Sequence, residues 1–171
     1  MKPTLWQRLD TWARRLLPAG LCLAFVLLSV VPVPVPGYAA VVPMLVLAAV
    51  FFWAVHHPRL LPPAVVFAVG LVLDILSGAP MGQGAVVLLA AYGVAASQRR
   101  FFHEKSFAQV WAGFVIVALL ASILAWALAL VAGGPLLPPR AAVFQYLLTV
   151  AVYPLVTWVL HGVQRLVPAE A

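Results

Sequence analysis

Long apolar runs occupy nearly the whole chain, and only short charged or proline-rich segments separate them. Hydrophobic residues make up 65% of the 171 residues and charged residues only 8%, whereas soluble domains are about 25% charged. Inside lipid, a backbone can satisfy its polar groups by forming helices. The sequence therefore predicts an all-α fold, a polytopic membrane helical bundle.

Six apolar segments are candidates for transmembrane helices, because one span needs about 20 mostly apolar residues. They cover residues 16–35, 38–55, 60–77, 84–97, 107–131 and 141–160. We expect residues 1–171 to form a single integral membrane domain, with residues 1–15 in the cytoplasm. That N-terminal segment is either a short amphipathic helix on the inner leaflet or a basic tail that only fixes orientation.

The basic residues fall almost entirely on one side of these spans. Nine of the ten lie before the first span, after the second, after the fourth or after the sixth, and only Arg140 lies on the other side. The positive-inside rule then predicts that both termini are cytoplasmic. This topology accounts for the net charge of +6 without a nucleic-acid partner.

Asp74 is the only acidic residue inside a predicted span. An ionised side chain at the centre of a bilayer costs at least about 2.5 kcal/mol, so it faces protein or water. Gly70, Gly78 and Gly82 share its helical face and predict close contact there. We expect leucine at Gly70 or Gly78 to disrupt the packing of this span, and alanine to be milder.

Three interpretations of Asp74 are open. It is a proton or ion site, a carboxylate buried against outer-side donors such as Arg140, Gln145 or Tyr146, or a protonated acid between helices. We favour the second, because one acid without a relay of partners is a poor path for transport. Its helical face meets either a partner protein or, more simply, another span of this chain.

A polar ridge runs along the sixth span at intervals of four residues. Polar side chains in a span seldom face lipid, so we expect the ridge to pack against another helix, in this chain or in a partner. Its members are Gln145, Thr149, Tyr153, Thr157 and His161.

The chain offers no cluster of catalytic or metal-binding groups. Asp74 has no second acid beside it, and all four histidines lie on the predicted cytoplasmic side. His56 and His57 are adjacent and point in different directions on a helix, which suits a metal poorly. Cys22 is the only cysteine. The sequence predicts no enzyme, no metal and no cofactor.

The pattern Gly70-X-X-X-Asp74-X-X-X-Gly78-X-Pro80-X-Gly82, with an apolar helix ending near Tyr92 and a basic loop after it, resembles the family of the rod shape-determining protein MreD. The resemblance extends over the chain in length, span number and orientation, and its specific motif covers residues 70–92. It implies a fold related to the substrate-binding subunits of energy-coupling-factor transporters.

This resemblance also implies a function. It implies a non-enzymatic scaffold of the cell-elongation complex in the bacterial inner membrane, helping to couple MreB filaments and MreC to peptidoglycan synthesis. MreC is the implied direct partner, with MreB, RodA and a penicillin-binding transpeptidase in the same complex. The alternative is the vitamin-binding subunit of a membrane transporter. The outer segments favour the scaffold, because they are mostly proline, glycine and aliphatic residues.

Overall fold

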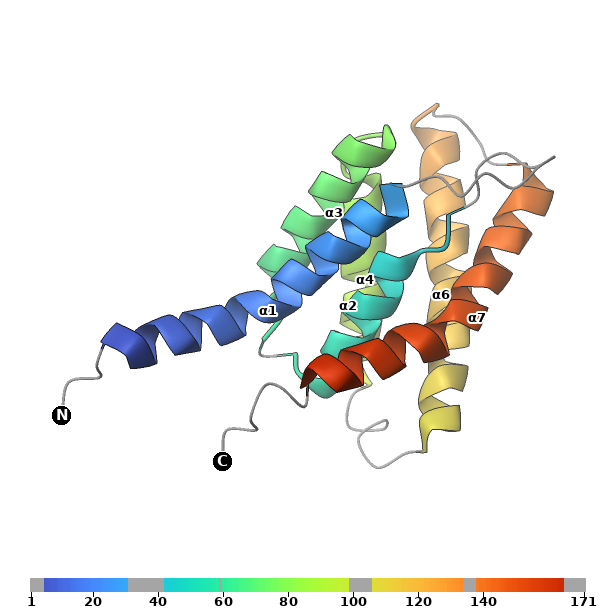
Figure 1. The fold of residues 1–171 in the computed structure, drawn as a ribbon. Coiled ribbons are helices and arrows are strands. Elements are labelled where there is room, and N and C mark those ends of the chain that lie inside the picture. The colour runs from blue at the N-terminus through green and yellow to red at the C-terminus, as the bar shows by residue number, and fades with distance from the viewer. Residues whose placement is uncertain (1–4, 31–41, 59, 99–105, 134–137, 165–171) are drawn as a thin grey trace.

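The computed structural model describes residues 5–30, 42–58, 60–98, 106–133 and 138–164. Within these ranges every regular element is an α-helix, so the predicted all-α class is confirmed (Figure 1). The helices are α1 (Leu5–Val30), α2 (Leu45–His56), α3 (Pro63–Ser77), α4 (Gln83–Ser97), α6 (Phe107–Val131) and α7 (Pro139–Gln164).

The helices differ in their ability to cross a membrane. Two stretches, Phe107–Val131 in α6 and Pro139–Val163 in α7, are long and apolar enough to do so. The other apolar stretches in the described ranges are shorter. α2 has 12 residues, which at the usual helical rise makes it about 18 Å long. The architecture is that of a membrane helical protein with helices of unequal length.

Prolines set several helix boundaries, because proline has no backbone N–H and fits the first turn of a helix. Residues 42–44 around Pro43 are not helical, so α2 begins at Leu45 instead of at residue 38. Pro63 begins α3 three residues later than expected, and Pro139 begins α7 two residues earlier. Only α6 coincides with its predicted span, 107–131.

The first helix also departs from the expected boundaries. α1 already begins at Leu5 and runs without interruption to Val30, so the segment predicted to end at residue 15 continues into the first span. The predicted end at residue 35 lies outside the described residues. α1 and α7 contain Pro18 and Pro154, and both helices bend along their length in Figure 1, as an internal proline predicts.

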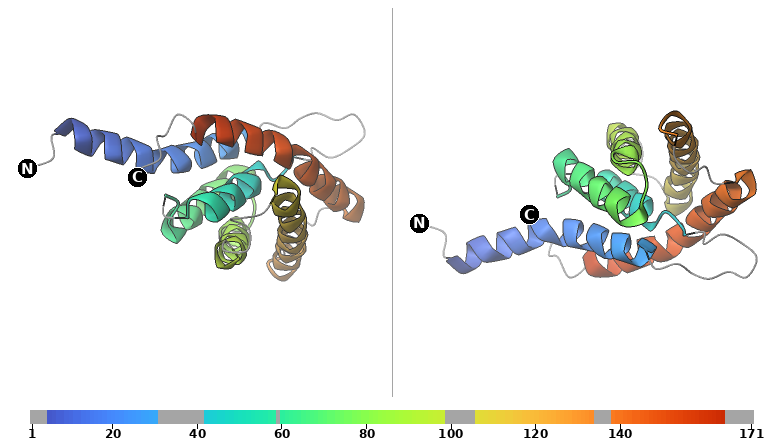
Figure 2. Two further views of the ribbon diagram at one scale, coloured as in Figure 1. Left: turned by 90° about the horizontal axis from the view of Figure 1, so that it is seen from below. Right: turned by 90° about the horizontal axis from the view of Figure 1, so that it is seen from above.

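α2 is the centre of the bundle. Eleven of its residues, Leu45 to Val55, are buried. α1, α4 and α7 pack along α2, and α6 touches it. The end-on views in Figure 2 place α1 and α7 on one side of α2 and α4 and α6 on the other, and α3 packs against α1 and α4. A helix that is apolar all round is expected where neighbours enclose it, and α2 is such a helix.

Candidate functional site

Asp74 lies in the last turn of α3, and only 2% of its surface is exposed. Its carboxylate accepts three backbone N–H groups from the start of α4. Gly84 donates to Oδ1 at 2.7 Å, and Gly82 and Ala85 donate to Oδ2 at 2.9 and 3.5 Å. A side chain of one helix therefore caps the N-terminus of the next.

This cap supplies what α4 lacks. The first amides of a helix have no partner within it and carry partial positive charge. The N-cap residue of α4 is Gly82, which has no side chain to accept them. Hydrogen bonds between an ionised group and backbone amides are among the stronger ones in proteins. Asp74 can thus stay inside an apolar bundle without a basic side chain beside it.

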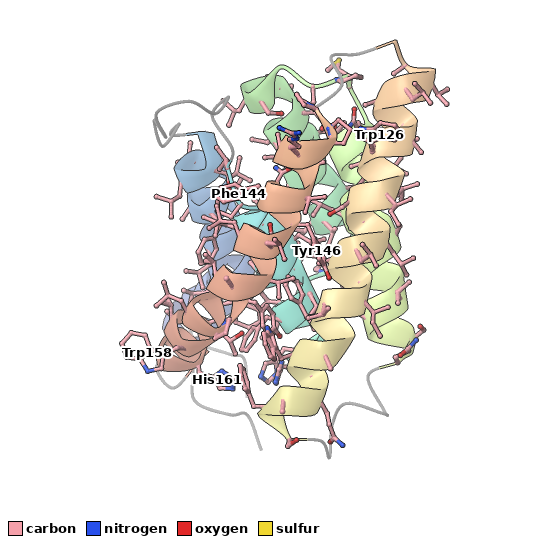
Figure 3. The ribbon with its side chains drawn as sticks, turned by 90° about the vertical axis from the view of Figure 1, so that its right-hand side faces the viewer. Trp126, Phe144, Tyr146, Trp158 and His161 are labelled. Atoms are coloured by element: carbon pink, nitrogen blue, oxygen red, sulfur yellow. The ribbon has the colours of Figure 1, made fainter. Side chains whose placement is uncertain are left out.

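Asp74 has donors, as the favoured interpretation requires, but they are not the expected ones. Gln145 donates Nε2 to the carbonyl oxygen of Val42 at 2.8 Å, and Tyr146 donates its hydroxyl to the carbonyl oxygen of Val115 at 3.3 Å. Tyr146 points from α7 toward α6 in Figure 3. Arg140 is exposed in the first turn of α7. One feature of the sequence could have predicted the donors of Asp74: the helix that starts at Gly82 has no N-cap side chain of its own to accept its first amides.

Gly78 and Gly82 allow the chain to reverse between α3 and α4. Their φ angles are +68° and +92°, in the region that glycine adopts without steric cost. A Cβ built on either residue meets no described atom within 4 Å. The described residues make no close helix contact at Gly78, and its positive φ gives this glycine a conformational role.

α3 and α4 approach each other closely at Gly70 and Gly84. A Cβ on Gly70 would overlap the backbone of Ala85, and a Cβ on Gly84 would overlap the Asp74 carboxylate. The face around Asp74 therefore packs against another helix of this chain. Even the methyl group of alanine at Gly70 would meet backbone atoms, and the expectation that alanine is milder there than leucine stays a prediction.

The upper part of the polar ridge holds the segment that leads into α2. Thr149 accepts the backbone N–H of Met44 at 3.0 Å and donates to the carbonyl oxygen of Gln145 at 2.7 Å. Gln145 bonds Val42, as described above. These contacts satisfy non-helical backbone that would otherwise be left without partners inside a membrane.

The lower part of the ridge packs against α2 and α6. The buried ring of Tyr153 stacks on Phe114, with centroids 4.0 Å apart, and meets Phe51 edge-on at 6.0 Å. The ring of His161 meets Phe52 edge-on at 5.0 Å. The ridge thus packs within the chain, the simpler of the two alternatives.

A cavity of about 510 Å³ lies beside Asp74, where α2 is too short to fill the bundle. All six described helices or their ends contribute to its wall. Trp126, labelled near the upper end of α6 in Figure 3, is part of it. One residue from or next to each helix, in chain order, is Ser29, Leu47, Asp74, Gln83, Ser122 and Gln145.

The cavity brings some of the predicted site residues together and leaves others apart. Asp74, Gly78, Pro80 and Gln145 line it. The predicted residues outside its wall are Gly70, Gly82, Tyr92, Arg140, Thr149 and Tyr153. The hydroxyl of Tyr92 donates to the carbonyl oxygen of Pro58 at 3.3 Å, at the α2–α3 turn. Sequence reasoning missed Gln83 and Ser122, which are single polar residues with no pattern of their own.

The described residues contain no group of three or more His, Cys, Asp or Glu side chains that could hold a metal ion. The rings of His56 and His161 lie 5.5 Å apart, but two imidazoles are fewer than the four ligands of a structural zinc site. The carboxylate of Asp74 is occupied by backbone amides. The Asp74 carboxylate thus caps α4, and the rings of His56 and His161 pack against each other.

Comparison with known proteins identifies the family. A family model described as the rod shape-determining protein MreD matches residues 13–161. Searches of curated proteins and of solved structures find no match. The family match takes in the α3–α4 turn, Asp74 and the whole wall of the cavity. The chain belongs to the family of the rod shape-determining protein MreD.

Proposed function

We propose that this chain is a non-enzymatic scaffold of the cell-elongation complex in the bacterial inner membrane. Family membership over residues 13–161 carries the proposal, since it indicates a role in rod shape determination. In this role the chain binds MreC and, through the complex, helps to couple MreB, RodA and a penicillin-binding transpeptidase during peptidoglycan synthesis. A scaffold needs a stable fold and a surface in the bilayer, and it needs no reactive group.

The proposed topology has six transmembrane spans with both termini in the cytoplasm. The distribution of nine basic residues to one side and Arg140 to the other supports it. The short helices α2, α3 and α4 require neighbours or a thinned bilayer to cover their ends, and α2 has such neighbours. We also propose that the fold resembles that of the substrate-binding subunits of energy-coupling-factor transporters. Short and long helices would then belong to one bundle.

The contacts of Asp74 support a structural role over a transport role. Three amides from the start of α4 occupy its oxygens, and no other acidic residue lies among the described residues that line the cavity. A proton or ion path needs a chain of exchanging groups. No comparison favours the alternative of a vitamin transporter subunit.

Affinity purification from native membranes tests the scaffold. The tagged chain, expressed at its natural level in a rod-shaped bacterium, should retain MreC and the other elongation proteins, identified by mass spectrometry. A tagged membrane protein of similar size and unrelated function is the control for detergent artefacts. Recovery of transporter ATPases in place of elongation proteins would contradict the proposal.

Cell shape gives the second readout. Cells that depend on this chain should stay rod-shaped with the wild-type protein and become round with Gly70→Leu, which drives a side chain into the backbone of Ala85. Ala127→Leu is the matched control, because Ala127 is exposed on α6 and leucine is well accommodated by lipid. Both variants must be quantified in membranes, so that loss of shape can be related to loss of the folded protein.

A further inference from the structure

The cavity beside Asp74 has the dimensions of a ligand site, and the scaffold role does not use it. Its volume of about 510 Å³ falls within the roughly 300–1,000 Å³ of small-molecule pockets. Aliphatic side chains such as Leu47, Leu73 and Val87 form much of its wall. An occupant must therefore have an apolar part.

The hydroxyl groups on the wall have already used their hydrogens inside the protein. Ser29 donates to the carbonyl oxygen of Phe25 at 2.7 Å, and Ser122 donates to that of Ala118 at 2.8 Å. A hydroxyl that donates one bond keeps two lone pairs. Both serines thus remain available to an occupant as hydrogen-bond acceptors.

The two glutamines on the wall also keep free hydrogen-bond acceptors. Gln83 and Gln145 donate Nε2 to the carbonyl oxygens of Ala125 and Val42 at 3.0 and 2.8 Å. Each keeps its Oε1 as an acceptor and one further N–H. Within the described part of the chain, Oε1 of Gln83 is buried without a hydrogen bond. The wall therefore has more acceptors than donors to offer.

The charged residues at the cavity also favour an occupant that donates hydrogen bonds. Asp74 gives the wall one negative charge, and no Lys, Arg or His stands among the described residues that line it. In the sequence, the segments 31–41 and 134–137 contain no basic residue. Arg140 is exposed and lies two residues from the lining residue Ala142, on the opposite side of the helix. Because its oxygens already bond the amides of α4, this carboxylate would act on a cation through its charge and not through a direct bond, and low-dielectric surroundings strengthen such an attraction.

We propose that the cavity binds a small amphipathic ammonium compound. Its aliphatic part lies against the leucine and valine side chains, and its N–H groups meet the free acceptors of the wall. An anionic head group is excluded, because it would meet Asp74 and mainly acceptors. A neutral hydroxyl head group binds more weakly, because it brings one donor and no charge. The site stands or falls independently of the scaffold role.

Three photoreactive probes of equal chain length test the proposed head group. Diazirine derivatives of octylamine, octanol and octanoate are added to the full-length chain in nanodiscs, and labelled peptides are mapped by mass spectrometry. We expect the amine to label the cavity-lining part of α4 about tenfold more than the carboxylate, with the alcohol between them, as expected for a charge-assisted hydrogen bond. Equal labelling by the three probes would overturn the proposal.

Matched variants separate binding in the cavity from partition into lipid. Ala125→Phe places a ring in the cavity, whereas Ala127→Phe, two residues along α6, points its ring outward. The first should lower amine labelling by at least about fivefold, since its ring occupies volume that the probe needs, and the second should leave it unchanged. Should Ala125→Phe not fold, Ser122→Val removes an acceptor at smaller change in volume. Amine labelling that persists in the folded variant would contradict the site.

Discussion

At the scale of single residues, Asp74 depends on the backbone that surrounds it. A buried charge is tolerated when each of its oxygens has a hydrogen-bond donor, and the amides of Gly82, Gly84 and Ala85 provide these donors. The same bonds fix the start of α4 against the end of α3. The absence of a side chain at Gly84 is part of the arrangement, because a Cβ there would overlap the carboxylate.

Replacing Asp74 separates its charge from its role as an acceptor. We expect Asp74→Leu to lower the free energy of unfolding by about 2–4 kcal/mol, because buried donors without partners cost about 1–3 kcal/mol each. Asp74→Asn keeps one oxygen acceptor and should lose about half as much. Thermal unfolding in detergent, followed by circular dichroism, measures both. Equal and complete loss would instead indicate an obligatory ionised site.

Gly70 and Gly93 form a matched pair of helical glycines. Gly70→Ala should destabilise the protein by about 1–3 kcal/mol, because the added methyl group meets the backbone of Ala85. Gly93→Ala places a methyl group where no described atom lies within 4 Å, so it should be neutral or stabilise by about 0.5–1 kcal/mol. The same melting experiment applies. A mild Gly70→Ala would mean that α3 and α4 can separate at little cost.

At the scale of helices, hydropathy predicted which segments are helical, but it did not predict where the helices begin and end, because local residues such as proline determine this. The apolar run of the second predicted span starts at residue 38, yet Pro43 leaves α2 a helix that begins at Leu45. The four-residue spacing from Gln145 to His161 predicted a packed face on α7. It could not identify α2 as the partner, because α2 is apolar on all sides and its sequence does not show which face contacts α7.

Tyr153 tests the contact between α7 and the centre of the bundle. Its ring stacks on Phe114, and its buried hydroxyl lies close to the side chain of Thr157. Tyr153→Phe should change stability by no more than about 1 kcal/mol, since it keeps the stacked ring and loses at most one hydrogen bond. Tyr153→Ala should cost about 3–5 kcal/mol through the cavity it leaves. If both variants lose stability equally, the hydroxyl and not the ring carries this contact, and the packing interpretation is wrong.

At the scale of the whole molecule, the alternating direction of the helices gathers the cavity at one end. The C-terminal ends of α1 and α3 and the starts of α2, α4 and α7 meet there, and α6 passes beside them. The sequence could predict this end as the side with few positive charges. It could not predict the cavity, which arises because α2 is shorter than its neighbours and residues 42–44 leave the helix.

The orientation of this end can be measured with cysteines that react with a membrane-impermeant maleimide. Cys22 is buried, so a Cys22→Ala background removes the native thiol from a packed position. Met81 and Pro138 are exposed at the cavity end, and Gln98 and Ser106 are exposed at the opposite end.

In intact cells from which the outer membrane has been made permeable, Met81→Cys and Pro138→Cys should be labelled. Gln98→Cys and Ser106→Cys should react only after the inner membrane is opened, because the basic residues near them favour the cytoplasm. Labelling of Ser106→Cys in intact cells would overturn the six-span topology.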